Sequence, residues 1–439
     1  MIRSGADPVI ASKNAEVSFF LFAIGGLVGL ANVPGLVMSS NGTEMVALAT
    51  NLVHHGFYGN PSPGFSTGPS AANPPMYPWI LAFLMICFRN PAAFRMAELI
   101  GCILTNALTA AWLPRVSWLF FSDIQPGIVA SVFWLLSLEL MPGWDVSYTT
   151  ASILLFCLFT AATIGKDRTF RYAILAGMLA GALFLFNPAS TLVFVAWTAY
   201  LLVWDGAAAR RKVTYCCVTL AISGLIAFGW MLRNELVLGG FVARTNFGET
   251  FYTSNNDCAQ PNLIDDVLNG CYSEYHPTGS LKEAKIMLRV GEVKYDRART
   301  DDAKAWIRSH PARFAQLTGA RAFYFWLPPL RLTRFKGAVI WIATILSLPG
   351  IALMAYRRLR VTRFVVAVLL VYPLMYYVVM ASLRYRYPIL WLTLLPAGYF
   401  IQWLAGNLAR MMKKQPRFRS SSRLDAVSEV GSAPLTAKR

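Results

Sequence analysis

The feature that most constrains this chain is a series of long apolar segments. A helix needs about 20 predominantly apolar residues to cross the roughly 30 Å hydrocarbon core of a bilayer. Ten segments approach that length: 17–38, 97–114, 126–142, 149–165, 172–187, 189–205, 213–233, 337–356, 364–382 and 387–406. The sequence therefore predicts an all-α polytopic integral membrane protein with about ten transmembrane helices, interfacial helices and two large extracytoplasmic loops.

The surplus of positive charge is explained by the same fold. The chain has 40 Lys and Arg against 22 Asp and Glu, which gives a formal net charge of +18. In a soluble protein this would suggest nucleic-acid binding, but in a polytopic protein Lys and Arg gather in cytoplasmic loops and set the orientation. Lys166–Arg171, Arg210–Lys212, Arg357–Arg363 and the tail from Arg410 fall on one side of the predicted bilayer. Both termini are therefore expected to be cytoplasmic, and no nucleic-acid partner is expected.

This orientation divides the chain into membrane modules and two outer loops. Arg3 and Lys13 precede the first apolar segment, which is too long for the apolar region of a cleaved signal peptide, so we expect a retained anchor. The expected parts are a cytoplasmic N-terminus (1–16), an N-terminal transmembrane module (17–233) with a catalytic extracytoplasmic loop at 39–96, a large extracytoplasmic loop (234–336), C-terminal transmembrane helices (337–406) and a basic, disordered cytoplasmic tail (407–439).

The large outer loop has helix signals of its own and two isolated cysteines. Ser280 and Glu283 form a capping-box pattern that predicts a helix start, and the aromatic, amphipathic segment 314–327 suits a helix that lies on the membrane surface. Cys258 and Cys271 are the cysteines of this loop. An oxidising periplasm would allow them to pair, and two free thiols are the alternative.

The first outer loop carries the most informative acid. Glu44 comes just before the helical run 45–53. It fits a helix cap in which Asn41 or Ser40 is the N-cap and Glu44 is the third helical residue. It also fits a catalytic carboxylate, because acids near a bilayer are costly and tend to be functional. Few other acids lie on this face outside the large loop: Glu98, Glu139 and Asp145.

Two further pairs on the outer side could bind substrate. His54 and His55 could relay a proton or bind a donor phosphate, and a solvated loop pair is the alternative. Arg384 and Arg386 could clamp a phosphate through bidentate hydrogen bonds, and snorkelling toward lipid headgroups is the alternative. The sequence has no nucleotide-binding glycine loop and no zinc-ligand spacing, so it predicts no structural metal.

Several short motifs together resemble the GT-C membrane glycosyltransferases. A helix reading Ala49-Thr50-Asn51-Leu52 is followed by His55–Gly59 and by Asn73–Ala82, which reads N-P-P-x-Y-P-x-x-L-A. The nearer similarity is to the branch of dolichyl-phosphate-mannose protein mannosyltransferases and bacterial polyprenyl-phosphate-sugar transferases. Further runs that resemble this group are Arg233-Asn234, Asn246–Gly248, Ser254–Asn256, Gly291-Glu292, His310-Pro311 and Arg384–Pro388.

The resemblance covers about residues 17 to 405 and implies an active site in the first outer loop. The donor would be a polyprenyl-phosphate-linked sugar, and the need for a metal varies in this group, so a divalent metal is left open as a cofactor. Tyr77, in the matching proline-rich run, is then expected to contact substrate. The chain departs from the family at Asn41, where the best register places the usual Asp. Either Glu44 has taken over its role, or the chain is a weak or inactive relative.

The expected function is an inverting glycosyltransferase that moves a sugar to an envelope glycolipid, glycan or protein at the periplasmic face of a bacterial inner membrane. Glu44 would be the general base, Asp145 would orient the acceptor or support Glu44, and Arg384 and Arg386 would hold the donor phosphate. A transporter or lipid flippase is one alternative, although the sequence lacks the internal repeats and midplane charges of carriers. A membrane protein that binds polyprenyl lipids without catalysis is the other, motivated by Asn41.

Overall fold

The computed structural model describes residues 8–35, 43–62, 64–203 and 207–414. Apart from two isolated bridges, the regular structure of these residues is helical. The elements are α1 (Pro8–Ala31), η1 (Val33–Gly35), α2 (Glu44–His55), α3 (Met76–Cys87), α4 (Pro91–Phe121), α5 (Gln125–Leu136), α6 (Val146–Thr163), α7 (Thr169–Phe186), η2 (Pro188–Ser190), α8 (Thr191–Leu202), α9 (Ala209–Leu238), α10 (Phe247–Ser254), α11 (Leu263–Leu268), α12 (Cys271–Tyr275), α13 (Leu281–Val290), α14 (Glu292–Ser309), α15 (Pro311–Trp326), α16 (Leu330–Tyr356), α17 (Val361–Val371), α18 (Leu374–Tyr377), η3 (Leu383–Tyr385) and α19 (Tyr387–Lys414). The chain forms two compact units, which divide after Ile401.

The all-α membrane fold predicted from the sequence is confirmed. Within the described ranges, seven helices are long and apolar enough to cross a bilayer: α1, α4, α6, α7, α9, α16 and α19. The other three expected spans, 126–142, 189–205 and 364–382, coincide with the shorter apolar helices α5, α8 and α17–α18. Helix α5 is only about 18 Å long at 1.5 Å per residue, because residues 137–145 leave the helix, which a hydropathy count does not detect.

Glycines allow the spans of the first unit to pack closely, as their spacing predicts. A Cβ atom at Gly25 would lie 2.8 Å from the Cα of Ala107, so α1 packs directly against the backbone of α4. A Cβ atom at Gly177 would lie 2.6 Å from the Cβ of Ile222, which places α7 equally close to α9. The main core mixes aliphatic and aromatic side chains, and its largest fully buried side chains are Trp134, Trp197 and Trp391.

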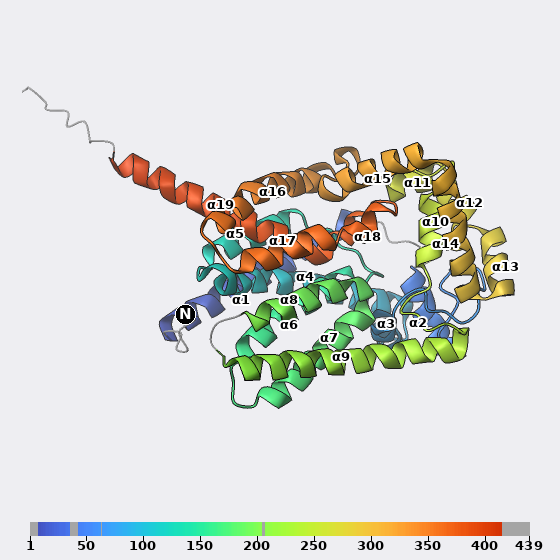
Figure 1. Ribbon diagram of the computed structural model, residues 1–439, viewed down its shortest axis with the longest axis horizontal. Helices are drawn as coiled ribbons and strands as arrows, with labels where there is room; N and C mark the ends of the chain where they lie inside the picture. The colour runs from blue at the N-terminus through green and yellow to red at the C-terminus, as the bar shows by residue number, and fades with distance from the viewer. Residues whose placement is uncertain (1–7, 36–42, 63, 204–206, 415–439) are drawn as a thin grey trace, which may run out of the picture. The chain divides into compact units, whose positions relative to one another are not determined.

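The short helices of the large outer loop lie at the same end of the first unit as α2 and α3 (Figure 1). The predicted helix start at Ser280 is confirmed, since its hydroxyl accepts a hydrogen bond from the N–H of Glu283 at 3.4 Å. The other half of the capping box does not form, because the N–H of Ser280 donates to the carbonyl of His276. The expected surface helix at 314–327 corresponds to α15, which begins at Pro311. The loop is thus a helical layer over the end of the membrane helices where the first outer loop also lies.

Candidate active site

Glu44 is the first residue of α2, and the turn before it fixes its position. Thr43 is the N-cap, because its hydroxyl accepts a hydrogen bond from the N–H of Val46. The predicted N-caps Asn41 and Ser40 lie outside the described residues, and the predicted capping box is wrong, because with Thr43 as the N-cap Glu44 is the first helical residue and not the third. Thr43 also donates a 2.6 Å hydrogen bond to the carbonyl of Gly143. At Gly143, with φ of 81°, a Cβ atom would lie 2.6 Å from Thr43 Cγ2, so glycine permits this contact between the two short outer segments.

A cavity of about 290 Å³ opens beside Glu44. Its walls come from the first outer loop, the loop before α6, the segment between α9 and α10, helix α12 and the segment before α19. Its polar or aromatic lining includes Glu44, Asn73, Trp144, Asp145, Arg244, Tyr272, His276 and Arg384. Two carboxyl groups and two guanidinium groups from four distant parts of the chain therefore face one space.

Asn73 connects the carboxylate of Glu44 to an arginine. Its buried side-chain amide donates to Glu44 Oε2 at 3.0 Å, and its Oδ1 accepts from Arg244 Nη2 at 3.1 Å. Arg244 Nε also donates to the carbonyl of Ala72 at 3.1 Å. These hydrogen bonds hold the Glu44 carboxylate and the Arg244 guanidinium in place beside the cavity.

Arg384 and Asp145 are also held by their neighbours. The Arg384 guanidinium lies 4.0 Å from the centre of the Trp144 ring and donates to the Tyr385 hydroxyl at 3.2 Å. Asp145 is buried, and its Oδ2 accepts from the Thr149 hydroxyl at 2.9 Å. Trp144 and Asp145 are adjacent, so the loop before α6 supplies both a support for Arg384 and the second carboxyl group of the cavity.

The large outer loop supplies an aromatic wall. The rings of Tyr272 and His276 stack with their centres 4.3 Å apart. His276 Nε2 lies 3.7 Å from Glu249 Oε1, and both side chains are buried. Burial lowers the pKa of His276 to about 4, and burial followed by the negative charge of Glu44 raises the pKa of Glu249. At neutral pH His276 is therefore an uncharged ring that can contact a substrate without competing with the arginines for a phosphate.

Glu292 joins the first outer loop to the large one. Its carboxylate accepts hydrogen bonds from the Ser70 hydroxyl and from the N–H of Ala71, both at 2.7 Å. Arg233 binds the same loop from α9, since its guanidinium donates to the carbonyls of Ser70 and Tyr58. These contacts hold the chain that leads to Asn73, and hence to Glu44.

Burial raises the pKa of Glu292 to about 7, and this shift predicts how the stability of the protein changes with pH. Because the pKa in the folded state lies above the ordinary value of 4.5, the protonated Glu292 contributes stability that is fully present below pH 4.5. This stability is lost as the pH rises through 7, at up to about 1.4 kcal/mol per pH unit. Thermal unfolding in detergent should therefore show a smaller loss of Tm between pH 5 and pH 7 for Glu292→Gln than for the wild type. Equal pH slopes for the two proteins would contradict the assignment.

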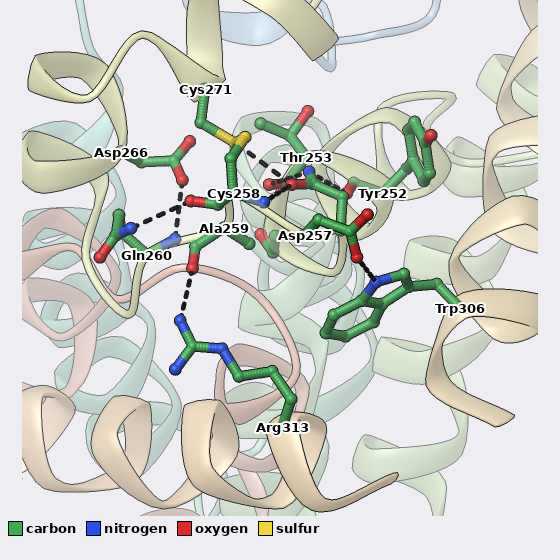
Figure 2. Close-up of a disulfide and its surroundings, with 12 residues drawn as sticks. Tyr252, Thr253, Asp257, Cys258, Ala259, Gln260, Asp266, Cys271, Trp306 and Arg313 are labelled. Carbon is green, nitrogen blue, oxygen red and sulfur yellow. Dashed lines mark hydrogen bonds between the residues drawn. A yellow bond between two sulfur atoms is a disulfide. The ribbon is translucent and has the colours of Figure 1, made fainter. Parts of the chain in front are cut away.

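Cys258 and Cys271 form a disulfide that closes a 13-residue separation (Figure 2). The disulfide-closed segment and the residue after it adjoin the cavity wall at two places. Tyr272 directly follows Cys271, and Pro261 and Leu263 exchange backbone hydrogen bonds with Ala381, three residues before Arg384. Figure 2 also shows the segment bound from outside, where Arg313 donates to the carbonyl of Ala259. The disulfide therefore supports both Tyr272 and Arg384.

Removal of this disulfide should destabilise the outer layer. A closed loop of this size constrains the unfolded chain by about 3 kcal/mol, so the double variant Cys258→Ser/Cys271→Ser should unfold at a lower temperature. The matched control is Cys87→Ser/Cys217→Ser, which removes two exposed free thiols and should leave the Tm unchanged. Unfolding scans with and without reductant measure the effect, and an equal Tm for the two double variants would argue against it.

Four of the residues predicted to bind substrate lie outside the cavity. His54 and His55 are exposed in the last turn of α2, about 16 Å from Glu44 along the helix at 1.5 Å per residue. Tyr77 is buried in the apolar cluster between α2, α3 and α4. Arg386 is 1% exposed and donates to the carbonyls of Phe325 and Trp326 and to the Thr344 hydroxyl. Its guanidinium ties the segment before α19 to α15 and α16 and does not line the cavity.

Other residues of the cavity were not predicted from the sequence. Arg244, rather than Arg386, is the second arginine beside Glu44, and Tyr272 and His276 form a wall. A weak signal for Arg244 was available, because it lies two residues before the Asn246–Gly248 run. Asn73 likewise opens the proline-rich run. The two outer loops come together only in the folded chain, so no spacing in the sequence indicates which of their residues share the cavity.

The donor set offers little for a metal ion. Glu44 and Asp145 are the carboxyl groups of the cavity, and Asn73 presents its amide N–H rather than its oxygen to Glu44. Among the described residues, no three His, Cys, Asp or Glu side chains come together as a metal site. These residues alone do not form a complete coordination shell, and Asn41 lies outside the described part of the chain.

A second, larger cavity of about 1070 Å³ adjoins the first and shares Trp144 and Arg384 with it. One part of its lining is apolar, from residues such as Phe94, Leu332 and Phe335. Another part is charged, from Arg95, Arg331, Arg334, Lys336, Glu98 and Glu139. This combination suits an amphiphilic molecule with a polar head directed toward Arg384.

Comparisons with known proteins gave structural similarity only. No known protein-family profile and no curated protein sequence matches the chain. Among solved structures, the archaeal oligosaccharyltransferase AglB from Archaeoglobus fulgidus in complex with an inhibitory peptide and a dolichol-phosphate has a TM-score of 0.52 at 14% identity, over 92% of this chain and 52% of that chain. The apo form of the Archaeoglobus fulgidus oligosaccharyltransferase has a TM-score of 0.51 at 13% identity, over 90% of this chain and 52% of that chain. The complex of that enzyme with zinc and sulfate has a TM-score of 0.52 at 14% identity, over 89% of this chain and 50% of that chain.

At these identities the similarity concerns the fold, and this chain spans about half of the length of those structures. It nevertheless extends over nine-tenths of this chain, and therefore reaches into both outer loops as well as the membrane helices. The chain therefore has the fold of the GT-C membrane glycosyltransferases.

Proposed function

We propose that the chain is an inverting glycosyltransferase that moves a sugar from a polyprenyl-phosphate-linked donor to an acceptor in the cell envelope, at the outer face of the inner membrane. The observation that carries the proposal is the cavity in which Glu44, Asp145, Arg244 and Arg384 meet. A base, a second carboxyl group and two phosphate-binding cations are the groups that such a transfer needs. The AglB structure in complex with a peptide and a dolichol-phosphate supports both kinds of partner.

In the proposed reaction Glu44 takes the proton of an acceptor hydroxyl. The freed oxygen forms a bond to the anomeric carbon while the bond from that carbon to the phosphate oxygen breaks, and the configuration inverts because the displacement is single. The lipid phosphate leaves with the negative charge, which Arg244 and Arg384 stabilise. Preorganised charge of this kind is often the largest contribution to catalysis, and both arginines are already held by hydrogen bonds or ring stacking. Asp145 would orient the acceptor.

The adjoining larger cavity is where we place the amphiphilic part of a substrate. It opens to the shared Arg384 and carries apolar and basic side chains together. A polyprenyl chain or a lipid acceptor would fit the apolar part, with its charged head near Arg384. The sugar and the acceptor class (glycolipid, glycan or protein) follow from the experiment below.

The test is mass spectrometry of envelope glycolipids and glycoproteins from a deletion strain, together with transfer by the purified protein from a polyprenyl-phosphate sugar. Loss of a sugar of defined mass from the deletion strain, restored by the wild-type gene, is the expected result. Uptake by sealed vesicles without sugar incorporation would support a carrier instead. Tight binding of the lipid-linked sugar without turnover would support the non-catalytic alternative that Asn41 motivates.

A further inference from the structure

Four arginines line a pocket of about 500 Å³ that shares no residue with the candidate active site. Arg168 and Arg171 come from the start of α7, and Arg210 and Arg211 come from the start of α9. The rest of the lining is Asp167, Thr169, Phe170 and Thr214. The orientation expected from the sequence places this pocket at the cytoplasmic surface.

The positive charge of this arginine pocket is poorly compensated. Asp167 is the acid of the lining, and its Oδ1 lies 3.3 Å from Arg211 Nη1, with both side chains exposed. Within the described ranges, the side chains of Arg168, Arg171 and Arg210 form no hydrogen bond or ion pair. Like charges that are held together without counter-charges repel each other, and a bound anion would relieve that repulsion.

Two helix N-termini add to this positive field. The contacts between α7 and α9 advance in the same direction along both helices, from Ala173 with Thr219 to Gly181 with Ile226, so the helices are parallel. Neither helix has a side-chain cap or an acid in its first turn. Unsatisfied N–H groups and the helix dipole make an N-terminus positive, and basic residues there are unfavourable unless an anion is present.

The pocket also lies where two spans leave the membrane. Helices α7 and α9 are both candidate membrane spans. Phe170 lines the pocket and is 60% exposed. Val213, which precedes the pocket residue Thr214 in the sequence, is 52% exposed. A ligand of this pocket would therefore meet apolar side chains as well as guanidinium groups, which is the environment of a lipid headgroup.

We propose that the arginine pocket binds the headgroup of an anionic phospholipid, and most tightly one that carries two phosphates. Two arginines from each helix give one pair for each phosphate, with the hydroxyl of Thr214 as a further donor. Basic pockets between membrane helices on the cytoplasmic side bind such headgroups in other membrane proteins. The site is separate from the proposed transfer reaction.

The test measures lipid binding to the full-length protein in detergent, by native mass spectrometry and by the rise in Tm. The probes are cardiolipin, phosphatidylglycerol, phosphatidylcholine and inorganic phosphate. We expect cardiolipin to bind more tightly than phosphatidylglycerol, and phosphatidylcholine and phosphate to have little effect. Arg171→Gln/Arg210→Gln should weaken cardiolipin binding by about tenfold or more, and Arg171→Lys/Arg210→Lys should retain most of it.

The matched control is Arg358→Gln/Arg363→Gln, which removes the same charge from two exposed arginines, one in the turn after α16 and one in the first turn of α17, on the expected cytoplasmic side. It should bind cardiolipin as the wild type does. Equal weakening in the two double variants would show non-specific attraction and overturn the proposal. Binding of inorganic phosphate as strongly as cardiolipin would also overturn it, because the site would then serve a free anion. If the glutamine variant does not fold, cardiolipin binding that is insensitive to NaCl in the wild type would decide against the proposal.

Discussion

The Glu44→Gln variant is expected to transfer sugar about 10²- to 10⁴-fold more slowly than the wild type, the usual contribution of a positioned general base. The amide is nearly isosteric with the carboxylate, and its oxygen can still accept the hydrogen bond from Asn73 Nδ2. Asn73 therefore keeps its contact with Arg244, and the cavity keeps its shape. The loss would appear in kcat, measured with a labelled polyprenyl-phosphate sugar in proteoliposomes, while Tm stays close to that of the wild type.

The control is Glu274→Gln, which changes an exposed acid of α12 that does not line the cavity. It should leave kcat and Tm unchanged. Full activity of Glu44→Gln would remove Glu44 from the proposed mechanism.

Asn41 offers a second, independent test of the same question. The resemblance to the GT-C group places the usual acid at this position, so Asn41→Asp introduces a second carboxylate on the segment before α2. If Glu44 has taken over the role, the single change should have little effect in the wild-type background. If instead the wild type is inactive and Asn41→Asp creates transfer activity, the chain is an inactive relative and Glu44 only holds Asn73 in place.

The fold could be predicted from the sequence because membrane spans depend on local composition. Hydropathy over about 20 residues locates the long helices, and the spacing of Gly177 and Gly181 indicates the close packing that α7 makes with α9. The same reasoning fails where apolar residues are not helical. Residues 137–145 are apolar enough to extend α5 in a window average, but the helix ends at Leu136, and the non-helical segment that follows carries Asp145.

The site was less predictable, because it depends on contacts between segments far apart in the chain. Glu44, Asp145 and Arg384 could be selected because charged residues are scarce near the membrane, and all three reach the cavity. Arg386 could not be separated from Arg384 by sequence, since the two differ only in which way the turn before α19 directs them. Arg244 could not be found by the same argument, because it belongs to a long loop in which arginine is common.

The variant Arg384→Gln is expected to lower kcat/KM for the lipid-linked donor by about 10²- to 10³-fold, the range found when one group that stabilises transition-state charge is removed. Arg384 faces the cavity, where its charge would compensate the departing phosphate, and its stacking on Trp144 keeps it in place without a bound ligand. Arg384→Lys should recover only part of the loss, because an ammonium group keeps the charge but not the planar, bidentate geometry. Steady-state kinetics at varied donor concentration measure both effects.

Arg386→Gln is the comparison that gives this prediction its meaning, because the two arginines are two residues apart and carry the same charge. The shorter side chain would leave the buried carbonyls of Phe325 and Trp326 without their donor, at a cost of about 1–3 kcal/mol for each group left unsatisfied. Its Tm should therefore fall, whereas kcat per folded molecule should stay within a few-fold of the wild type.

Arg384→Gln should show the opposite pattern, with lost catalysis and a nearly unchanged Tm. A fall in Tm for Arg384→Gln with donor kinetics unchanged would mean that its stack on Trp144 is structural, and Arg244 would then be the arginine to test for the phosphate.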